Sequence, residues 1–281
     1  MRAPLSILLL TPVALFGCER AGTDPIGPAA PLAPKENLAL AGLVVASVGH
    51  TQFGEQSFNS SRVAAAFGLR NLGCQYASID GCALASCSLG DGAPHFGALS
   101  LSSANRSLLL EPSGDGEYSA VDDVSRVAKS GDKVTIRGFG GPNTLGSFDS
   151  TLALPGDMVV SKLSGSSAWP FPNLKIDVTR DLSLTWPMAK APSQVAVAIS
   201  AKGETTTAEL VCPFAGNTGM GTASAAALAA LPKGNGRLRA GAASTQRIAT
   251  SELAVDWVLI NTATVEGTNG VVPASLAIVV E

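Results

Sequence analysis

From residue 39 to its end, the chain alternates short apolar runs with turns. Residues 133–137 and 173–178 switch between polar and aliphatic side chains at each position, which is the period of a strand with one buried face. Segments rich in Gly, Ser, Pro and Asp, such as 113–116 and 140–143, separate the runs. Strands are expected at 40–48, 62–67, 98–102, 107–110, 133–137, 147–154, 173–178, 181–186, 194–200, 205–214, 237–240, 253–260 and 274–280.

One segment, residues 222–231, has helical character. It starts with a hydroxyl residue that can cap a helix and continues with Ala and Leu, which are strong helix formers. Pro232-Lys233-Gly234 then stops it. The pattern predicts a short helix that packs across the open end of a sandwich.

Many short strands with one small helix predict an all-β fold of two antiparallel Ig-like β-sandwich domains. Residues 39–156 and 157–281 each have about the size of one such sandwich, roughly 100 residues. The turn Leu154-Pro155-Gly156-Asp157 is the best boundary between them. A single larger β-domain is the alternative.

The N-terminus has the pattern of an export signal. Met1 and Arg2 give a short positive start, and residues 3–17 are almost wholly apolar. This run is shorter than the roughly 20 apolar residues that a membrane-spanning helix needs. Residues 18–38 are rich in Pro, Ala and Gly without an apolar period, which predicts an extended tether.

The string Leu15-Phe16-Gly17-Cys18 resembles the lipobox of bacterial lipoproteins. The resemblance implies that residues 1–17 are a signal peptide and that Cys18 carries the lipid, palmitate included. It also implies an outer-membrane location, because Glu19 rather than Asp follows Cys18. An ordinary signal with cleavage elsewhere, and Cys18 as an incidental thiol, is the alternative.

Further motifs are similar to a set of uncharacterised myxobacterial-type lipoproteins. They are Asp181–Trp186, Leu210–Phe214 and Ala223–Pro232 in the second half, and clustered cysteines followed by Phe96–Leu101 in the first. The resemblance covers most of residues 60–281. It implies the fold and the location, and it carries no assigned activity.

Four cysteines follow the tether: Cys74, Cys82, Cys87 and Cys212. An even number in an exported chain predicts disulfides, with three connectivities open. Bridges among Cys74, Cys82 and Cys87 are favoured, with Cys212 paired or buried. Metal binding ranks lower, since the spacing lacks the CxxC pairs of zinc and iron–sulfur sites.

Composition narrows the range of partners. Hydrophobic residues make up 46% of the chain and charged residues 15%, which favours a packed core over disorder. The net charge is −3, so no basic field for nucleic acid is indicated. Gly138–Gly141 lacks the Lys and Ser/Thr of a phosphate-binding loop, and no cofactor is expected.

No constellation of catalytic residues stands out. His50 and His95 are isolated and favour surface or turn positions, and no G-x-S-x-G elbow occurs. The carboxylates Asp115, Glu117 and Asp122-Asp123 could bind calcium, although Asp-Gly pairs are typical of turns.

The three tryptophans differ in their settings. Trp186 and Trp257 lie in predicted strands and are expected in the core. Trp169 lies in a loop, which makes it the best candidate for a ligand contact or for a plug between the two sandwiches.

The leading hypothesis is a non-enzymatic, lipid-anchored cell-envelope protein with a binding, adhesion or structural role. Its partners would be the membrane, through the lipid, and a protein or polysaccharide ligand. The alternative is an envelope hydrolase with a carboxylate-based site in a loop-lined cleft. A deep pocket that holds two acids, or an acid with His50 or His95, would favour the hydrolase.

Overall fold

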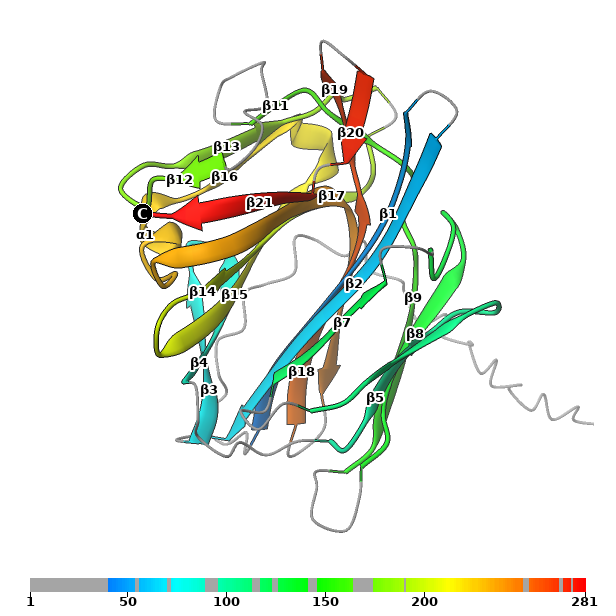
Figure 1. Cartoon of the computed structure of the whole chain (residues 1–281), viewed down its shortest axis with the longest axis vertical. Coiled ribbons are helices and arrows are strands. Elements are labelled where there is room, and N and C mark those ends of the chain that lie inside the picture. The colour runs from blue at the N-terminus through cyan, green and yellow to red at the C-terminus, as the bar shows by residue number, and fades with distance from the viewer. Residues whose placement is uncertain are drawn as a thin grey trace, which may run out of the picture.

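The computed structural model describes residues 40–281 apart from short gaps at 54–55, 70–71, 89–95, 113–116, 123–125, 141–145, 164–173, 190, 250–252, 268–269 and 274. The predicted signal, the tether, Cys18, His95 and Trp169 therefore lie outside the described residues. The rest is almost entirely strand, which confirms the all-β class (Figure 1).

The strands have the following bounds. They are β1 Leu40–Phe53, β2 Gln56–Leu69, β3 Leu72–Ile79, β4 Cys82–Ser88, β5 Leu99–Ser102, β6 Ser107–Leu110, β7 Glu117–Asp122, β8 Lys133–Gly138, β9 Phe148–Ala153, β10 Val159–Val160, β11 Lys162–Leu163, β12 Leu174–Ile176, β13 Leu182–Thr185, β14 Gln194–Lys202, β15 Thr206–Ala215, β16 Met220–Ala223, β17 Gly234–Ala249, β18 Leu253–Thr262, β19 Thr264–Gly267, β20 Gly270–Pro273 and β21 Ser275–Val280. A 3-10 turn η1 (Gly216–Thr218) and a helix α1 (Ala225–Leu228) interrupt them. Every range predicted as a strand overlaps one, whereas β3, β4, β7, β10, β11, β16, β19 and β20 were not predicted.

The largest sheet closes on itself. Its strands follow the order β12-β21-β17-β14-β15-β4-β3-β2-β1-β18, and β18 also pairs with β17. The eight strands from β17 round to β18 thus form a ring, and we call their inward-facing side the ring interior. Small and aliphatic side chains fill it, among them Ala66, Ala85, Ala198, Val211 and Ile260.

β17 is the strand that closes the ring. Its first part pairs with β14 and β21, and its later part, Gly241–Ala249, pairs with β18. Gly241 lies where β18 takes over from β21. A Cβ atom there would lie 2.0 Å from the backbone oxygen of Asn261, so the close approach of β18 requires glycine.

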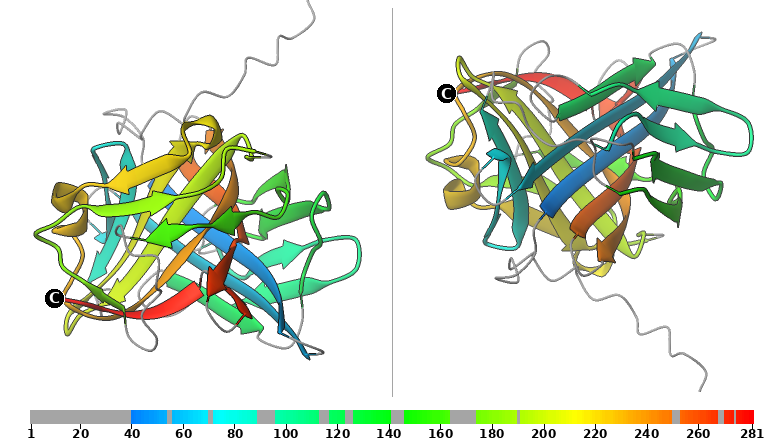
Figure 2. Two further views of the ribbon diagram at one scale, coloured as in Figure 1. Left: turned by 90° about the horizontal axis from the view of Figure 1, so that it is seen from above. Right: turned by 90° about the horizontal axis from the view of Figure 1, so that it is seen from below.

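The first hydrophobic core lies between β1, β2, β7 and β18 on one side and the sheet β6-β5-β8-β9 on the other. Trp257 on β18 is fully buried there. Phe67, Phe96, Tyr118 and Phe148 meet in a cluster of edge-to-face and tilted ring contacts. Figure 2 shows the small sheet on the outer side of β1 and β2, away from β14 and β15.

The second core lies on the outer face of β4, β14, β15, β17 and β21. The sheet β11-β13-β16 and α1 cover this face. Trp186 is buried in this core, and its indole Nε1 donates to the Gly216 carbonyl at 2.7 Å. The expectation that Trp186 and Trp257 belong to the core is therefore confirmed.

The strand pairing differs from the predicted division of the chain at 156/157. The ring takes strands from both sides of the expected boundary at 156/157, because β18 pairs with β1 and β15 pairs with β4. The two halves of the chain therefore share one sheet and do not form separate sandwiches. The sheets are also mixed, since β1–β18, β10–β19 and β12–β21 are parallel pairs.

The predicted helix at 222–231 is too long. Only Ala225–Leu228 is helical, and Thr222 lies in β16, where it pairs with Ser183 of β13. Pairing with β13 thus outweighs the helix propensity of the first residues. The cap is Ser224, whose Oγ accepts from the Ala227 amide at 3.2 Å.

Candidate functional site

Two disulfides join β4 to both of its neighbours. Cys74 on β3 is bonded to Cys87, and Cys82 is bonded to Cys212 on β15. Cys82 and Cys87 lie an odd number of positions apart on β4, so they face opposite sides of the sheet. Cys82 belongs to the second core and Cys87 to the ring interior. The prediction that these four cysteines form disulfides is confirmed, and the connectivity is now fixed.

A two-residue turn sets the first pair. Asp80 and Gly81 both have positive φ, 48° and 82°, as the tight turn of a hairpin requires. Ile79 is therefore opposite Cys82, and Cys74 falls opposite Cys87. The hairpin register thus places the first two sulfurs on adjacent strands, opposite one another.

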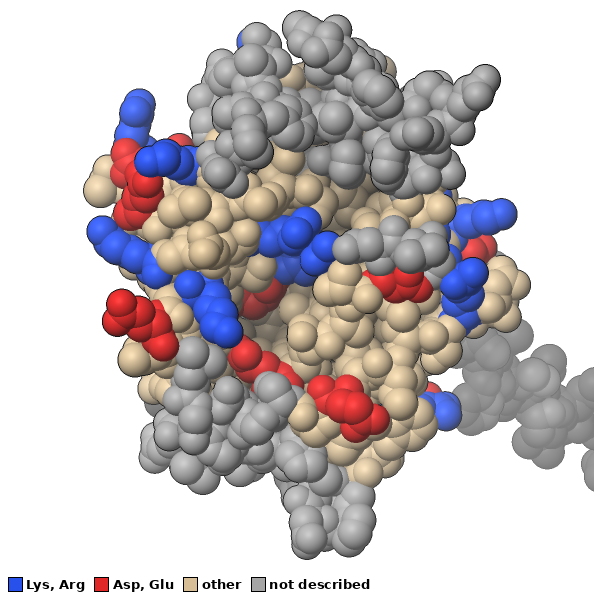
Figure 3. Space-filling view, viewed as in Figure 1, with Lys and Arg blue, Asp and Glu red and all other residues tan. Residues whose placement is uncertain are grey.

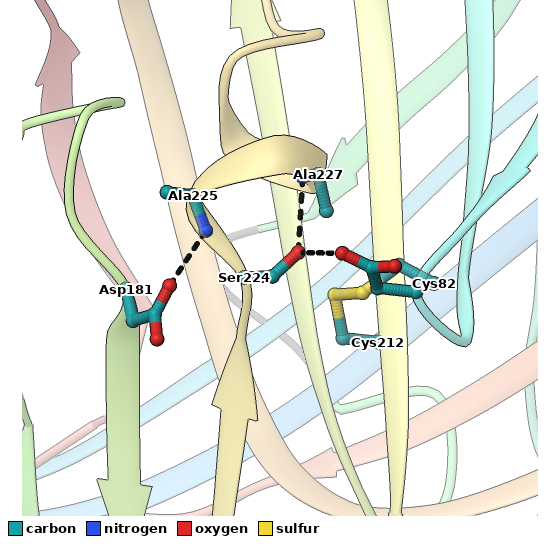
Figure 4. Close-up of a disulfide and its surroundings, with 7 residues drawn as sticks. Cys82, Asp181, Cys212, Ser224, Ala225 and Ala227 are labelled. Carbon is teal, nitrogen blue, oxygen red and sulfur yellow. Dashed lines mark hydrogen bonds between the residues drawn. A yellow bond between two sulfur atoms is a disulfide. The ribbon is translucent and has the colours of Figure 1, made fainter.

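The second disulfide lies beside the start of α1 (Figure 4). Ser224 Oγ donates to Asp80 Oδ2 at 2.7 Å, and Asp181 Oδ1 accepts from the Ala225 amide at 2.8 Å. The β3–β4 turn and the residue before β13 are therefore both hydrogen-bonded to the start of α1, where β4 meets β15.

A buried ion pair lies on the ring-interior side of the sheet. Arg239 on β17 donates to Glu209 on β15, and the two side chains are 3% and 9% exposed. They flank β14, whose Ala198 and Ser200 are their register partners and leave room for the long side chains. Burial raises the pKa of Glu209, and the charge of Arg239 lowers it.

A cavity of about 320 Å³ opens beside this pair. The strands β2 and β3 pair only at Gly68–Leu69 with Leu72–Gly73, and the cavity lies between residues of β2 and β7 and residues of β4, β14 and β15. Thr207 of β15 donates to Glu117 of β7 across this gap. Basic and acidic side chains surround a hollow in the middle of the face in Figure 3.

The cavity wall combines small apolar side chains with a few polar ones. Leu43, Ala64 and Ala85 supply apolar wall, while Glu117, Lys202 and Glu209 supply charge. Such a wall can hold a small molecule with an apolar body and a polar end. Glu117 and Glu209 are functional candidates that the sequence pattern did not bring together.

A third carboxylate, Asp256 on β18, has an unusual environment. Burial raises its pKa to about 7, and the charge of Arg247, its register partner, lowers it. Folded protein thus holds a proton on Asp256 at pH values where the unfolded chain has released it. The stability from this proton is present below the ordinary pKa near 3.8 and is lost as the pH rises through 7.

We expect wild-type protein to lose on the order of 2–3 kcal/mol of unfolding free energy between pH 5 and pH 8 from this group. Asp256→Asn, which stays neutral, should lack this loss, whereas the exposed control Asp149→Asn should keep it. Urea denaturation at both pH values measures the difference. If wild type and Asp256→Asn lost the same unfolding free energy between pH 5 and pH 8, the raised pKa would not belong to Asp256.

Other residues singled out by the sequence do not assemble with this cavity. His50 is exposed on β1, where its Nδ1 lies 2.8 Å from Asn59 Oδ1. Among the described residues no group of three or more His, Cys, Asp or Glu side chains is placed to hold a metal ion. Within the same residues, no helix has the length and apolar character to cross a membrane.

No protein-family model and no curated protein matches this chain. Among solved structures, the chain has 7% identity with the FN1–FN3 domains of chicken CNTN1, with 78% of each chain covered and a TM-score of 0.21. It has 12% identity with a 1.5-MDa bacterial ice-binding adhesin, with 74% of each chain covered and a TM-score of 0.17. Similarity at this level carries no conclusion about function.

Proposed function

We propose that the protein is a lipid-anchored bacterial cell-envelope protein that acts by binding a ligand or partner and not by catalysis. The observation that carries the proposal is the pair of disulfides on β4. Disulfides form and persist in oxidising compartments such as the periplasm and the cell surface. The two disulfides therefore agree with export out of the cytoplasm, which the pattern of residues 1–17 predicts.

The N-terminal sequence supports the anchor. The lipobox-like string ends at Cys18, and residues 18–38 provide a Pro/Ala/Gly-rich spacer before β1 begins at Leu40. A spacer of this composition holds a folded domain away from the surface to which its first residue is attached. Outer-membrane attachment through Cys18 is the location that we propose.

The contacts of the cavity favour binding over hydrolysis. Glu117 and Glu209 line the same cavity, which is the arrangement that the hydrolase alternative needs. However, Arg239 holds Glu209 in an ion pair, and Thr207 donates to Glu117. Both carboxylates therefore serve contacts between strands. A closed sheet in which disulfides join β4 to both neighbouring strands supplies a rigid scaffold for loops and cavities that bind a ligand.

Cys18→Ser tests the anchor. We expect radiolabelled palmitate to appear on wild-type protein in the membrane fraction, because Cys18 is the proposed acceptor. The Cys18→Ser variant should lack the label and leave the membrane fraction. Glu19→Gln, next to the site, is the matched control and should behave as wild type. Unlabelled, soluble wild-type protein would overturn the proposal.

A further inference from the structure

A second cavity, separate from the ring interior, gathers positive charge. Its volume is about 490 Å³, and Arg106, Arg126 and Lys129 line it together with His50, Asn59 and Asp157. Three permanent cations thus face one carboxylate, in a chain whose net charge is −3. We name this cavity the basic pocket.

Four separate segments build the basic pocket. His50 and Asn59 are register partners on β1 and β2, and Arg106 lies in the turn between β5 and β6. Arg126 and Lys129 come from the segment before β8, and Asp157 follows β9. Arg126 and Lys129 lie close together in sequence, but Arg106 lies 20 positions before Arg126, so the tertiary fold brings it to the other two cations.

Hydrogen bonds of backbone groups and of neighbouring polar side chains hold the segments in place. Ser103, in the same turn as Arg106, donates through Oγ to the Val127 carbonyl at 2.6 Å. The Val127 amide donates to Ser61 Oγ at 2.8 Å, and the Lys129 amide donates to Asp132 Oδ2 at 2.8 Å. The backbone beneath the basic pocket is therefore fixed, which lowers the entropic cost of binding there.

The Arg126 guanidinium has a hydrogen-bond donor that the described residues do not use. Its side chain is 15% exposed, and its NH2 group lies 3.4 Å from Asn261 Oδ1 and 3.6 Å from Asp157 Oδ1. The same Asp157 oxygen already accepts from the Asn261 amide at 2.9 Å. Arg126 Nε is buried and has no hydrogen-bond partner in the described part of the chain. A buried donor without an acceptor is costly, so an oxyanion that reaches it would satisfy it.

We propose that the basic pocket binds a doubly charged oxyanion of the phosphate-monoester class. The three cations exceed the single carboxylate by two, which matches the charge of such a group. Arginine forks also recognise tetrahedral oxyanions through paired hydrogen bonds. The oxyanion can belong to a soluble sugar phosphate or to a lipid headgroup, and these share the same recognition chemistry.

Calorimetric titration with inorganic phosphate at low ionic strength tests the proposal, with an expected Kd of about 1 mM. The double variant Arg106→Gln/Lys129→Gln should bind about tenfold more weakly. Both residues are exposed, so the variant should fold. The control Arg180→Gln/Lys233→Gln removes the same charge from exposed positions outside the basic pocket and should stay within about twofold of wild type.

Two further arms identify the source of the oxyanion. Competition by glucose 6-phosphate supports a soluble phosphate ester, and capture on phosphatidic acid vesicles that is lost in Arg106→Gln/Lys129→Gln supports a headgroup. Absence of phosphate binding to wild-type protein would overturn the proposal. Equal weakening by the pocket and control variants would overturn it too, because the effect would then be one of net charge.

Discussion

Replacing Cys82 and Cys212 together by alanine is expected to lower the free energy of unfolding by about 5 kcal/mol. The disulfide joins residues 130 positions apart, so its loss frees a long loop in the unfolded chain. At about 2–4 °C per kcal/mol, the melting temperature should fall by roughly 10–20 °C. Thermal unfolding followed by circular dichroism measures this.

The other disulfide is the matched control. Cys74 and Cys87 are 13 positions apart, so Cys74→Ala/Cys87→Ala should cost only about 3 kcal/mol. The larger effect at Cys82–Cys212 reflects its place between β4 and β15, strands from the two halves of the chain. Equal losses, or a larger loss for Cys74–Cys87, would contradict the view that the second disulfide holds the halves together.

Arg239→Met is expected to destabilise the protein by about 3–5 kcal/mol at pH 8, because it leaves the Glu209 carboxylate buried without its cation. Protonation of Glu209 relieves this cost. Without Arg239 its pKa should rise further, so the loss should be smaller at pH 5 than at pH 8. Denaturant unfolding at pH 5 and at pH 8 measures the loss of unfolding free energy at each pH.

The double variant Arg239→Met/Glu209→Leu provides the control. It replaces both partners with apolar side chains, which is often neutral or stabilising for a buried pair. We expect it to recover most of the stability and to lose the added pH dependence. A double variant as unstable as Arg239→Met would show that packing of the arginine stem, and not the unpaired charge, dominates.

Local pattern predicted part of the strands: β3, β4, β7 and the short strands β10, β11, β16, β19 and β20 were missed. The alternation of Lys133–Arg137 predicted β8, and the aliphatic run of Leu253–Ile260 predicted β18. β17 is longer than its predicted range of 237–240, because Gly241–Ala249 gains its order from pairing with β18. Alternation and aliphatic runs therefore identified part of the sheet, and pairing with partner strands set the rest.

One of the two disulfides could be predicted from the sequence. Asp80-Gly81 is a strong signal of a two-residue hairpin turn, and that turn alone makes Cys74 the partner of Cys87. The expectation of bridges among Cys74, Cys82 and Cys87 did not use this signal. The bond from Cys82 to Cys212 depends on the β4–β15 register, which a long-range contact sets and which sequence does not reveal.

The candidate sites were less predictable than the fold. A single Glu inside the apolar strand around Leu210 suggests a buried partner, but nothing in the sequence selects Arg239. The basic pocket joins Arg106, Arg126 and Lys129 only because the β5–β6 turn bonds to the segment before β8. Convergence of this kind follows from tertiary hydrogen bonds.

The central claim is that the protein is exported and that disulfides join β4 to both of its neighbouring strands. The disulfide map of protein purified from cells tests it most directly. Trypsin leaves Cys74, Cys82 and Cys87 on one peptide, because no Lys or Arg lies between Arg70 and Arg106. Non-reduced protein should therefore be cut with pepsin, which can cleave near Leu84, and analysed by mass spectrometry. We predict peptides linked as Cys74–Cys87 and Cys82–Cys212. A Cys82–Cys87 link, or four free thiols, would contradict the account.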